Sequence, residues 1–280
     1  MHMLTRLTEH RVLKPWGRSD VPPEFGKTDN EERLGEIWFQ RDGLATDPLL
    51  VKYLFTSENL SIQVHPNDAD ARGHGKERGK DEAWLILDAD PGARIGIGLR
   101  EPLGPEELRA SALDGSIVDL MDWRDARTGD AYYSPAGTLH SIGSGLVLLE
   151  VQQNSDTTYR LYDFGRRRDL HLDQGVNATN TGTKVSKAEE IALENGRTRL
   201  VGGSKFTIER LQLNGKMQLH ASVSAPLWLI PMSGQIFAGN ERLERPSVWI
   251  AEAVISLRMD PKAELLVAYE GESIRELGLD

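Results

Sequence analysis

The feature that most constrains this chain is a set of polar side chains spaced for the strands of a β-barrel. Side chains repeat every two residues on one face of a strand, so Gln63 and His65 would share a face, as would Lys80 and Glu82. If both faces point inward, where His140 would join them, many polar groups are buried together. Their burial is costly unless something satisfies them, as a divalent cation does. The spacing therefore predicts a metal site inside a β-barrel.

The four candidate metal ligands are Gln63, His65, Glu82 and His140. Together they form a mixed nitrogen and oxygen site with a single negative charge, so a bound divalent ion would keep net positive charge and act as a Lewis acid. Ligands without sulfur fit Zn²⁺, one ion per chain, and also fit Fe²⁺, Co²⁺, Ni²⁺ and Mn²⁺. The chain has no cysteine, which excludes thiolate ligands and disulfides.

The residues around these ligands resemble one family closely. Four blocks carry the resemblance in the family's order: SIQVHPN at 61–67, GKDEAW at 79–84, GDAYYSPAGTLH at 129–140 and LEVQQNSDTTYRLYDF at 149–164. They look like the signature blocks of type I mannose-6-phosphate isomerases, which are zinc enzymes of the cupin superfamily. The match spans residues 48–173 and thins outside them.

The resemblance implies a reaction and a substrate. The expected activity is reversible interconversion of mannose 6-phosphate and fructose 6-phosphate, by proton transfer between C2 and C1 through a cis-enediol(ate). The residue types agree in outline, since a metal can polarise sugar oxygens, a carboxylate or lysine can move the proton, and cationic side chains can hold negative charge. The expected partner is a small-molecule sugar phosphate.

The candidate catalytic residues lie mainly in the last block. Glu150, Asp156, Arg160 and Arg166 align with ionisable positions of the family's Glu-x₅-Asp-x₃-Arg-x₅-basic arrangement, which implies that Arg160 lies beside the reacting carbons. Arg166 suits phosphate because a guanidinium can donate two hydrogen bonds while staying charged. Glu150 and Asp156 compete for the role of base. The alternatives are an Asp156–Arg160 salt bridge that holds a loop, and a solvated arginine cluster over residues 166–168.

Two lysines and a serine are further candidates for handling substrate. Lys80 should face the metal, where its neutral form is favoured and proton transfer becomes feasible; the resemblance implies the same role. Lys52 and Ser61 match a lysine and a serine that lie at or near the family's sugar-phosphate site. Alternatively, Lys80 is a solvated lysine at the strand mouth, and Lys52 is an outward charge on an edge strand.

The pattern along the chain predicts a mainly β protein. Gly, Pro, Asn and Asp bound most of the strand-like runs, which lie at 49–55, 83–87, 94–99, 146–152 and 206–213. The clearest helix is predicted at 105–113, with Pro and two acids in its first turn and Asp-Gly after it. Many short strands with few helices indicate a sandwich or jelly roll. The resemblance makes this a cupin double-stranded β-helix.

Two jelly-roll domains are expected. We predict a metal-binding catalytic cupin domain over residues 1–173, a linker rich in Asn, Thr and Gly over 174–187, and a degenerate jelly roll over 188–280. The last segment again looks like strands separated by turns, but it carries no second ligand set. This organisation rests on that pattern and on the two-barrel organisation of the resembled family.

Composition limits the partners. The chain of 280 residues has a net charge of −10, which argues against nucleic acid or a membrane surface as a partner. Residues 1–7 lack the apolar stretch of a signal peptide and nothing approaches a membrane span, so a cytoplasmic location is expected. The sequence leaves monomer and homodimer undecided.

Three other classes of function fit some of these features. One is an isomerase of an unphosphorylated sugar. Another is a cupin dioxygenase that binds Fe²⁺, although that class usually places more histidines on the metal than the two available here. The third is a non-catalytic sugar-binding or regulatory cupin.

Overall fold

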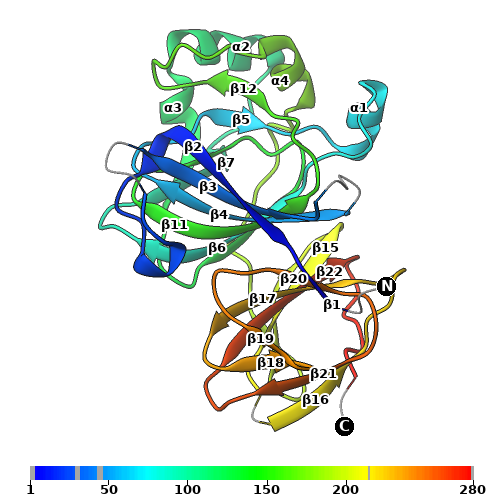
Figure 1. Ribbon diagram of the computed structural model, residues 1–280. Helices are drawn as coiled ribbons and strands as arrows, with labels where there is room; N and C mark the ends of the chain where they lie inside the picture. The colour runs from blue at the N-terminus through cyan, green and yellow to red at the C-terminus, as the bar shows by residue number, and fades with distance from the viewer. Residues whose placement is uncertain (1–3, 29–31, 43–46, 214, 279–280) are drawn as a thin grey trace.

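The computed structural model describes residues 4–28, 32–42, 47–213 and 215–278. Within these ranges the chain is mainly β, and its strands pair antiparallel in four sheets (Figure 1). The two ends of the predicted domain assignment, residues 1–3 and 279–280, lie outside the described residues. No described helix is long and apolar enough to cross a membrane.

The N-terminal half consists of a six-stranded and a five-stranded sheet. In spatial order, the six-stranded sheet contains β2 (Thr8–Arg18), β3 (Leu34–Gln40), β4 (Leu49–Thr56), β11 (Leu146–Gln153), β6 (Glu82–Ala89) and β9 (Ala131–Ser134). The five-stranded sheet contains β12 (Tyr159–Tyr162), β5 (Ile62–Val64), β10 (His140–Ile142), β7 (Arg94–Leu99) and β8 (Met121–Asp125). We call the space between these two sheets the lumen.

Alternation along the central strands decides what enters the lumen. All eight residues of β11 are buried because both of its faces are covered. Leu148 packs in the apolar cluster between the two N-terminal sheets, whereas Leu149 packs in a cluster on the opposite face. Glu150 and Gln152 share the face of Leu148, so two polar side chains point into the lumen from the middle of the sheet.

The C-terminal half contains a seven-stranded and a four-stranded sheet. The larger one contains, in order, β1 (Leu4–Arg6), β20 (Trp249–Ala251), β17 (Leu227–Ser233), β22 (Glu264–Glu270), β15 (Phe206–Leu211), β14 (Arg197–Gly202) and β13 (Ile191–Ala192). The smaller one contains β16 (Gly215–Leu219), β21 (Ile255–Met259), β18 (Ile236–Ala238) and β19 (Glu241–Leu243). Apolar side chains such as Leu229, Leu257 and Val267 pack between these sheets.

Helices cover one outer face of the N-terminal half. These helices are α2 (Pro105–Asp114), α3 (Ile117–Leu120) and α4 (Leu172–Ala178). Their apolar side chains form a cluster with residues of β5, β7 and β12, and Figure 1 shows them at the end of the molecule away from β16. The other helical segments are a 3₁₀ turn near the N-terminus, η1 (Pro23–Phe25), and α1 (Asp68–Gly73).

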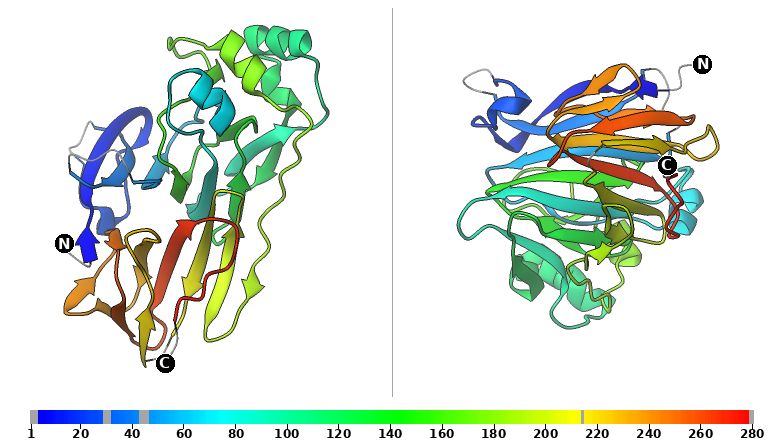
Figure 2. Two further views of the ribbon diagram at one scale, coloured as in Figure 1. Left: turned by 90° about the vertical axis from the view of Figure 1, so that its right-hand side faces the viewer. Right: turned by 90° about the horizontal axis from the view of Figure 1, so that it is seen from below.

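The two halves pack sheet against sheet. One apolar cluster contains Tyr53 and Leu149 from the six-stranded sheet together with Ile208 and Leu266 from the seven-stranded sheet. The chain also crosses between the halves at its start, because β1 pairs with β20 (Figures 1 and 2). This packing brings turns of the C-terminal half close to loops of the N-terminal half.

The predicted elements agree well with the observed ones. The predicted strands coincide with β4, β6, β7, β11 and β15, and the predicted helix coincides with α2. The predicted linker at 174–187 is helical in its first part, because residues 174–178 belong to α4. There Gly175 packs against Leu161 and Val176 is buried. Helical packing outweighs the loop-like composition there. The domain boundaries themselves stay a prediction.

Candidate metal centre and its cavity

Two histidines and a glutamate converge inside the lumen. His65 follows β5, while Glu82 begins β6 and His140 begins β10. One ligand atom from each lies within 4.8 Å of the other two, and all three residues are buried. The Nε2 atoms of His65 and His140 lie 3.3 Å from the two carboxylate oxygens of Glu82, one on each.

Backbone carbonyls orient both imidazole rings. His65 donates its Nδ1–H to the carbonyl of Thr157 at 2.8 Å, and His140 donates its Nδ1–H to the carbonyl of Thr138 at 2.9 Å. A carbonyl can only accept, so each ring carries its proton on Nδ1 and presents an Nε2 lone pair to Glu82. Burial lowers the pKa of both rings, that of His65 to about 4. Both imidazoles are therefore neutral near pH 7.

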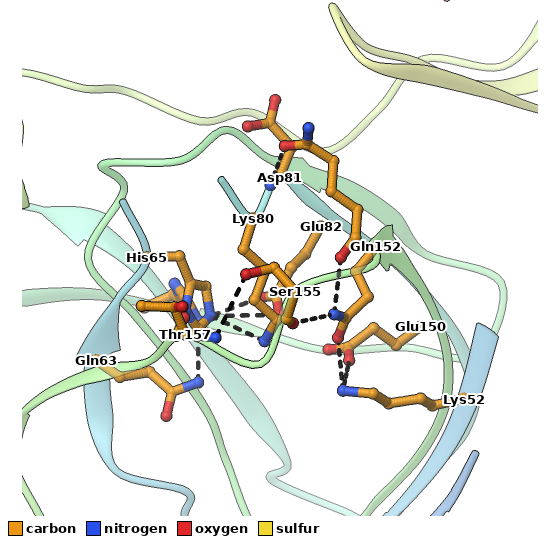
Figure 3. Close-up of polar contacts among 12 residues, drawn as sticks. Lys52, Gln63, His65, Lys80, Asp81, Glu82, Glu150, Gln152, Ser155 and Thr157 are labelled. Atoms are coloured by element: carbon orange, nitrogen blue, oxygen red, sulfur yellow. Dashed lines mark hydrogen bonds and ion pairs between the residues drawn. The ribbon is translucent and has the colours of Figure 1, made fainter. Parts of the chain in front are cut away.

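The cluster has the donor set of a divalent cation site. Burial alone would raise the pKa of Glu82, but its neighbours, with the charge of Lys80 first among them, outweigh it and hold that pKa well below its usual range. Two nitrogen lone pairs and a carboxylate thus face one another, which is unfavourable unless a cation lies between them. Lys80 supplies one positive charge, with Nζ 2.6 Å from Glu82 Oε1 and 3.3 Å from His65 Nε2 (Figure 3).

Gln63 lies beside the cluster. It is paired with His140 across β5 and β10, and its Nε2 lies 3.3 Å from His140 Nε2. Its Oε1 accepts a hydrogen bond from Ser61 at 2.9 Å. A carboxamide binds a cation through oxygen, so Gln63 would have to turn that oxygen toward the cluster. Its role as fourth ligand stays a prediction.

A polar cavity of about 310 Å³ adjoins the cluster, and Glu82 lies in its wall. Eight of its lining residues are site residues predicted from the sequence: Lys52, Ser61, Gln63, Lys80, Glu82, Glu150, Asp156 and Arg160. The other lining residues were not predicted to have a role in the site: Lys14, Trp16, Glu36, Trp38, Leu54, Leu60, Ile142, Ser155, Thr158 and Arg168. For Trp16 and Trp38 a signal existed, because KPWG at 14–17 and LGEIW at 34–38 resemble N-terminal Trp-Gly and Gly-Glu-x-Trp elements of the family, although Trp there serves equally well as a fold marker.

Lys52 and Glu150 form a buried ion pair in the cavity wall. Lys52 Nζ lies 3.1 Å from Glu150 Oε1 and 2.5 Å from Gln152 Oε1 (Figure 3). Trp84 donates its indole N–H to the other carboxylate oxygen of Glu150 at 3.0 Å. Burial alone would lower the pKa of Lys52, but Glu150 and nearby Glu36 outweigh it and raise that pKa. The alternatives of an outward Lys52 and a solvated Lys80 are wrong, since both side chains are buried.

Asp156 and Arg160 both line the cavity, but they differ in how far they are exposed to solvent. Asp156 lies at the rim with 76% of its side chain exposed, and it pairs with Lys76 at 3.3 Å. Arg160 is the β12 partner of Gln63 and donates from Nη1 to the carbonyl of Asp169 at 2.9 Å. Its Nε is buried with no hydrogen-bond partner in the described part of the chain. The alternative Asp156–Arg160 salt bridge is not among the contacts of the described residues.

The two outer arginines of the predicted cluster share one carboxylate. Arg166 donates to Asp163 at 2.9 Å and to the carbonyl of Asn59 at 2.7 Å, and it does not line the cavity. Arg168 donates to both oxygens of Asp163, from Nε at 2.7 Å, and it does line the cavity. The sequence showed only a run of three arginines, so nothing in it distinguished the member that faces the cavity.

No protein-family model matches the chain. Among curated proteins, it is 30% identical over 305 residues to a mannose-6-phosphate isomerase of Streptococcus mutans, with 92% of this chain and 96% of the relative covered. It is 43% identical over 136 residues to mannose-6-phosphate isomerase ManA of Bacillus subtilis, with 46% of this chain and 43% of the relative covered.

Solved structures have the same fold. A mannose 6-phosphate isomerase from Bacillus subtilis superposes with a TM-score of 0.82 at 26% identity, covering 95% of this chain and 99% of that one. A zinc-bound mannose 6-phosphate isomerase superposes with a TM-score of 0.71 at 14% identity, covering 96% and 100%. The fold is thus that of these isomerases over nearly the whole chain.

Proposed function

The chain belongs to the mannose-6-phosphate isomerase family, and from this we propose that it is a zinc-dependent enzyme that interconverts mannose 6-phosphate and fructose 6-phosphate. The observation that carries the proposal is the His65–Glu82–His140 cluster, which adjoins a polar cavity lined with cationic side chains. The substrate is accordingly a small-molecule sugar phosphate.

His65, Glu82 and His140 would hold the zinc ion, with Gln63 as the candidate fourth ligand. Their lone pairs and negative charge support this assignment, because a divalent ion takes up the charge that otherwise repels inside the cluster. Bound zinc supplies Lewis-acid polarisation of sugar oxygens.

Glu150 is the candidate for the base that moves the proton between C2 and C1 through the cis-enediol(ate). Its side chain is buried in the cavity wall, and the hydrogen bonds from Lys52 and Trp84 hold the carboxylate in one orientation. A fixed, water-excluded carboxylate is suited to proton transfer. Asp156, the competing candidate, is mostly exposed to solvent at the rim.

Lys80 and Arg160 are assigned to the sugar oxygens. Lys80 lines the cavity and already donates to Glu82, so its ammonium is near any oxygen bound beside the cluster. It is a candidate for moving a proton to or from a hydroxyl group. Arg160 carries a fixed positive charge and a buried, unpaired Nε–H among the described residues, which suits stabilisation of a developing enediolate.

The phosphate is assigned to the arginine side of the cavity. Arg168 lines it together with Arg160 and Lys14. Asp163 binds Nε and Nη2 of Arg168, which leaves its Nη1 group and its charge for a phosphate. Arg166, the residue aligned with the family's basic position, is held by Asp163 and Asn59 outside the lining. Lys52 and Ser61 are buried, line the same cavity and remain candidates for binding the substrate.

The decisive experiment is to incubate zinc-loaded protein with mannose 6-phosphate and measure fructose 6-phosphate. Mannose and a chelated sample serve as controls. Chelator-sensitive turnover of the phosphate ester, with little turnover of mannose, is the expected result. Turnover of mannose instead would indicate an isomerase of free sugars, and binding without turnover by zinc-replete protein would indicate a binding protein.

A further inference from the structure

A turn of the C-terminal half contacts the segment that carries Lys80 and Glu82. Residues 203–205 join β14 to β15, and they lie beside loops of the N-terminal half that precede β6 and include α1. The contacts run through two aspartates, Asp68 and Asp81, which are not part of the metal cluster. These two carboxylates connect the turn to the cavity wall.

Asp68 is the first connection. Lys205 Nζ lies 2.7 Å from Asp68 Oδ2, while Asp68 Oδ1 accepts the amide N–H of Gly79 at 2.8 Å and a side-chain N–H of Gln153 at 3.1 Å. Burial alone would raise the pKa of Asp68, but its hydrogen bonds and the charge of Lys205 lower it to about 2. The carboxylate is thus ionised and holds the residue directly before Lys80.

Asp81 is the second connection. This buried residue lies between Lys80 and Glu82, and its side chain points away from the lumen in Figure 3. Its carboxylate accepts the amide N–H of Ala136 at 3.0 Å, the hydroxyl of Tyr133, and the hydroxyl of Ser204 at 3.4 Å. Because neighbouring side chains in an extended segment point to opposite sides, anchoring Asp81 on one side aims Lys80 and Glu82 to the other.

Close packing reinforces this contact. The ring of Tyr133 lies against Gly203 so closely that a Cβ atom there would lie 1.9 Å from a ring carbon. The amide N–H of Lys205 points to the Tyr133 hydroxyl at 3.3 Å, and the rings of Tyr133 and Phe206 lie 5.4 Å apart. The turn therefore fits the N-terminal half with little freedom to move.

We propose that the turn at residues 203–205 is a positioning element of the catalytic site, and that Lys205 acts on catalysis through Asp68 and the 79–82 segment. The predicted effect on turnover rests on the proposed function, whereas the contacts of the turn do not. The C-terminal half, whose interior is mostly apolar, thereby gains a role in the catalytic site. Contacts that do not touch the substrate contribute to catalysis by holding the reactive groups in position to within a fraction of an ångström.

The test compares Lys205→Met with Lys205→Arg and with a matched control. Glu252→Gln is the control, because Glu252 pairs with Arg41 across the same two halves at 3.0 Å without touching residues 79–82. Each protein is loaded with zinc, and kcat and KM for mannose 6-phosphate are measured, with kcat expressed per bound zinc. Hydrogen–deuterium exchange of residues 76–86 is measured in parallel, as a readout that needs no turnover.

We expect Lys205→Met to lower kcat about tenfold with little change in KM, and to speed exchange at residues 79–82. Lys205→Arg should keep most of the wild-type kcat and the slow wild-type exchange at residues 79–82. Glu252→Gln should change neither kcat nor exchange. Loss of kcat without faster exchange, or faster exchange with normal kcat, would overturn the proposal. If the wild-type protein does not turn over the sugar phosphate, the proposed function fails, while faster exchange in Lys205→Met alone still supports the mechanical connection.

Discussion

The imidazole rings of His65 and His140 lie 4.9 Å apart, centroid to centroid, and each is fixed by a backbone carbonyl so that its unprotonated nitrogen faces the same carboxylate. Neither ring can rotate without losing its hydrogen bond. The arrangement is characteristic of metal-binding histidines, whose second nitrogen is commonly held by an acceptor. Both rings therefore present an Nε2 lone pair to the position that a cation would take.

Replacing Glu82 with Gln should weaken zinc binding by roughly a hundredfold or more, because the change removes the cluster's negative charge and leaves two neutral imidazoles. Zinc content after dialysis, measured by atomic absorption, checks this. Glu36→Gln is the matched control, since Glu36 lines the cavity but does not belong to the cluster. Equal zinc retention in the two variants would contradict the ligand assignment.

Glu150→Gln should lower kcat on the order of 10²-fold or more, whereas Asp156→Asn should change it only a few-fold. The reason is that Glu150 is buried and held by Lys52 and Trp84, while Asp156 is largely exposed. Steady-state kinetics with mannose 6-phosphate at equal zinc content separate the two. The reverse order of effects would assign the base to Asp156.

Arg168→Ala should raise KM for mannose 6-phosphate about tenfold or more, because a guanidinium in the cavity wall is lost. Arg166→Ala should leave KM close to the wild-type value, since that side chain is engaged with Asp163 and Asn59 outside the cavity. Inhibition by inorganic phosphate offers a second measurement of the same difference. A larger KM effect for Arg166 would reverse the phosphate assignment.

Asp68 should make stability depend on acid pH. Its pKa in the folded chain is about 2, against an ordinary value of 3.8, so its contribution is full above about pH 4 and is lost as pH falls toward 2. We expect Asp68→Asn to reduce the free energy of unfolding by about 1–2 kcal/mol at pH 7, and by about half as much at pH 3. Urea titrations at both pH values measure this. A difference from wild type that stays constant with pH would refute it.

Arg197→Met should destabilise the C-terminal half by about 3–5 kcal/mol, because it leaves the fully buried carboxylate of Glu209 without its cation. Urea-induced unfolding measures the loss. Arg242→Met serves as the control, since its bridge to Glu244 is exposed on both sides and such pairs contribute well under about 1 kcal/mol. Similar losses in the two variants would contradict the importance of the buried pair.

Much of the fold and part of the site follow from local pattern. The strands β4, β6 and β11 were predictable because apolar residues and turn residues mark them over a few positions. The convergence of His65, Glu82 and His140 was predictable because period-two spacing and the flanking blocks agree. The short helix α4 was not, since its sequence is rich in loop-forming residues and packing on Leu161 decides its conformation.

The chemical types available to the site and the strands that carry them can be predicted locally, because both are properties of residues close together in the chain. Which of those residues meet is set by the packing of the whole molecule. Lys52 and Glu150 are 98 positions apart, and Lys205 and Asp68 are 137 apart. Such pairs depend on how whole sheets pack, so no local pattern specifies that Arg168 lines the cavity or that a turn of the C-terminal half supports Lys80 and Glu82.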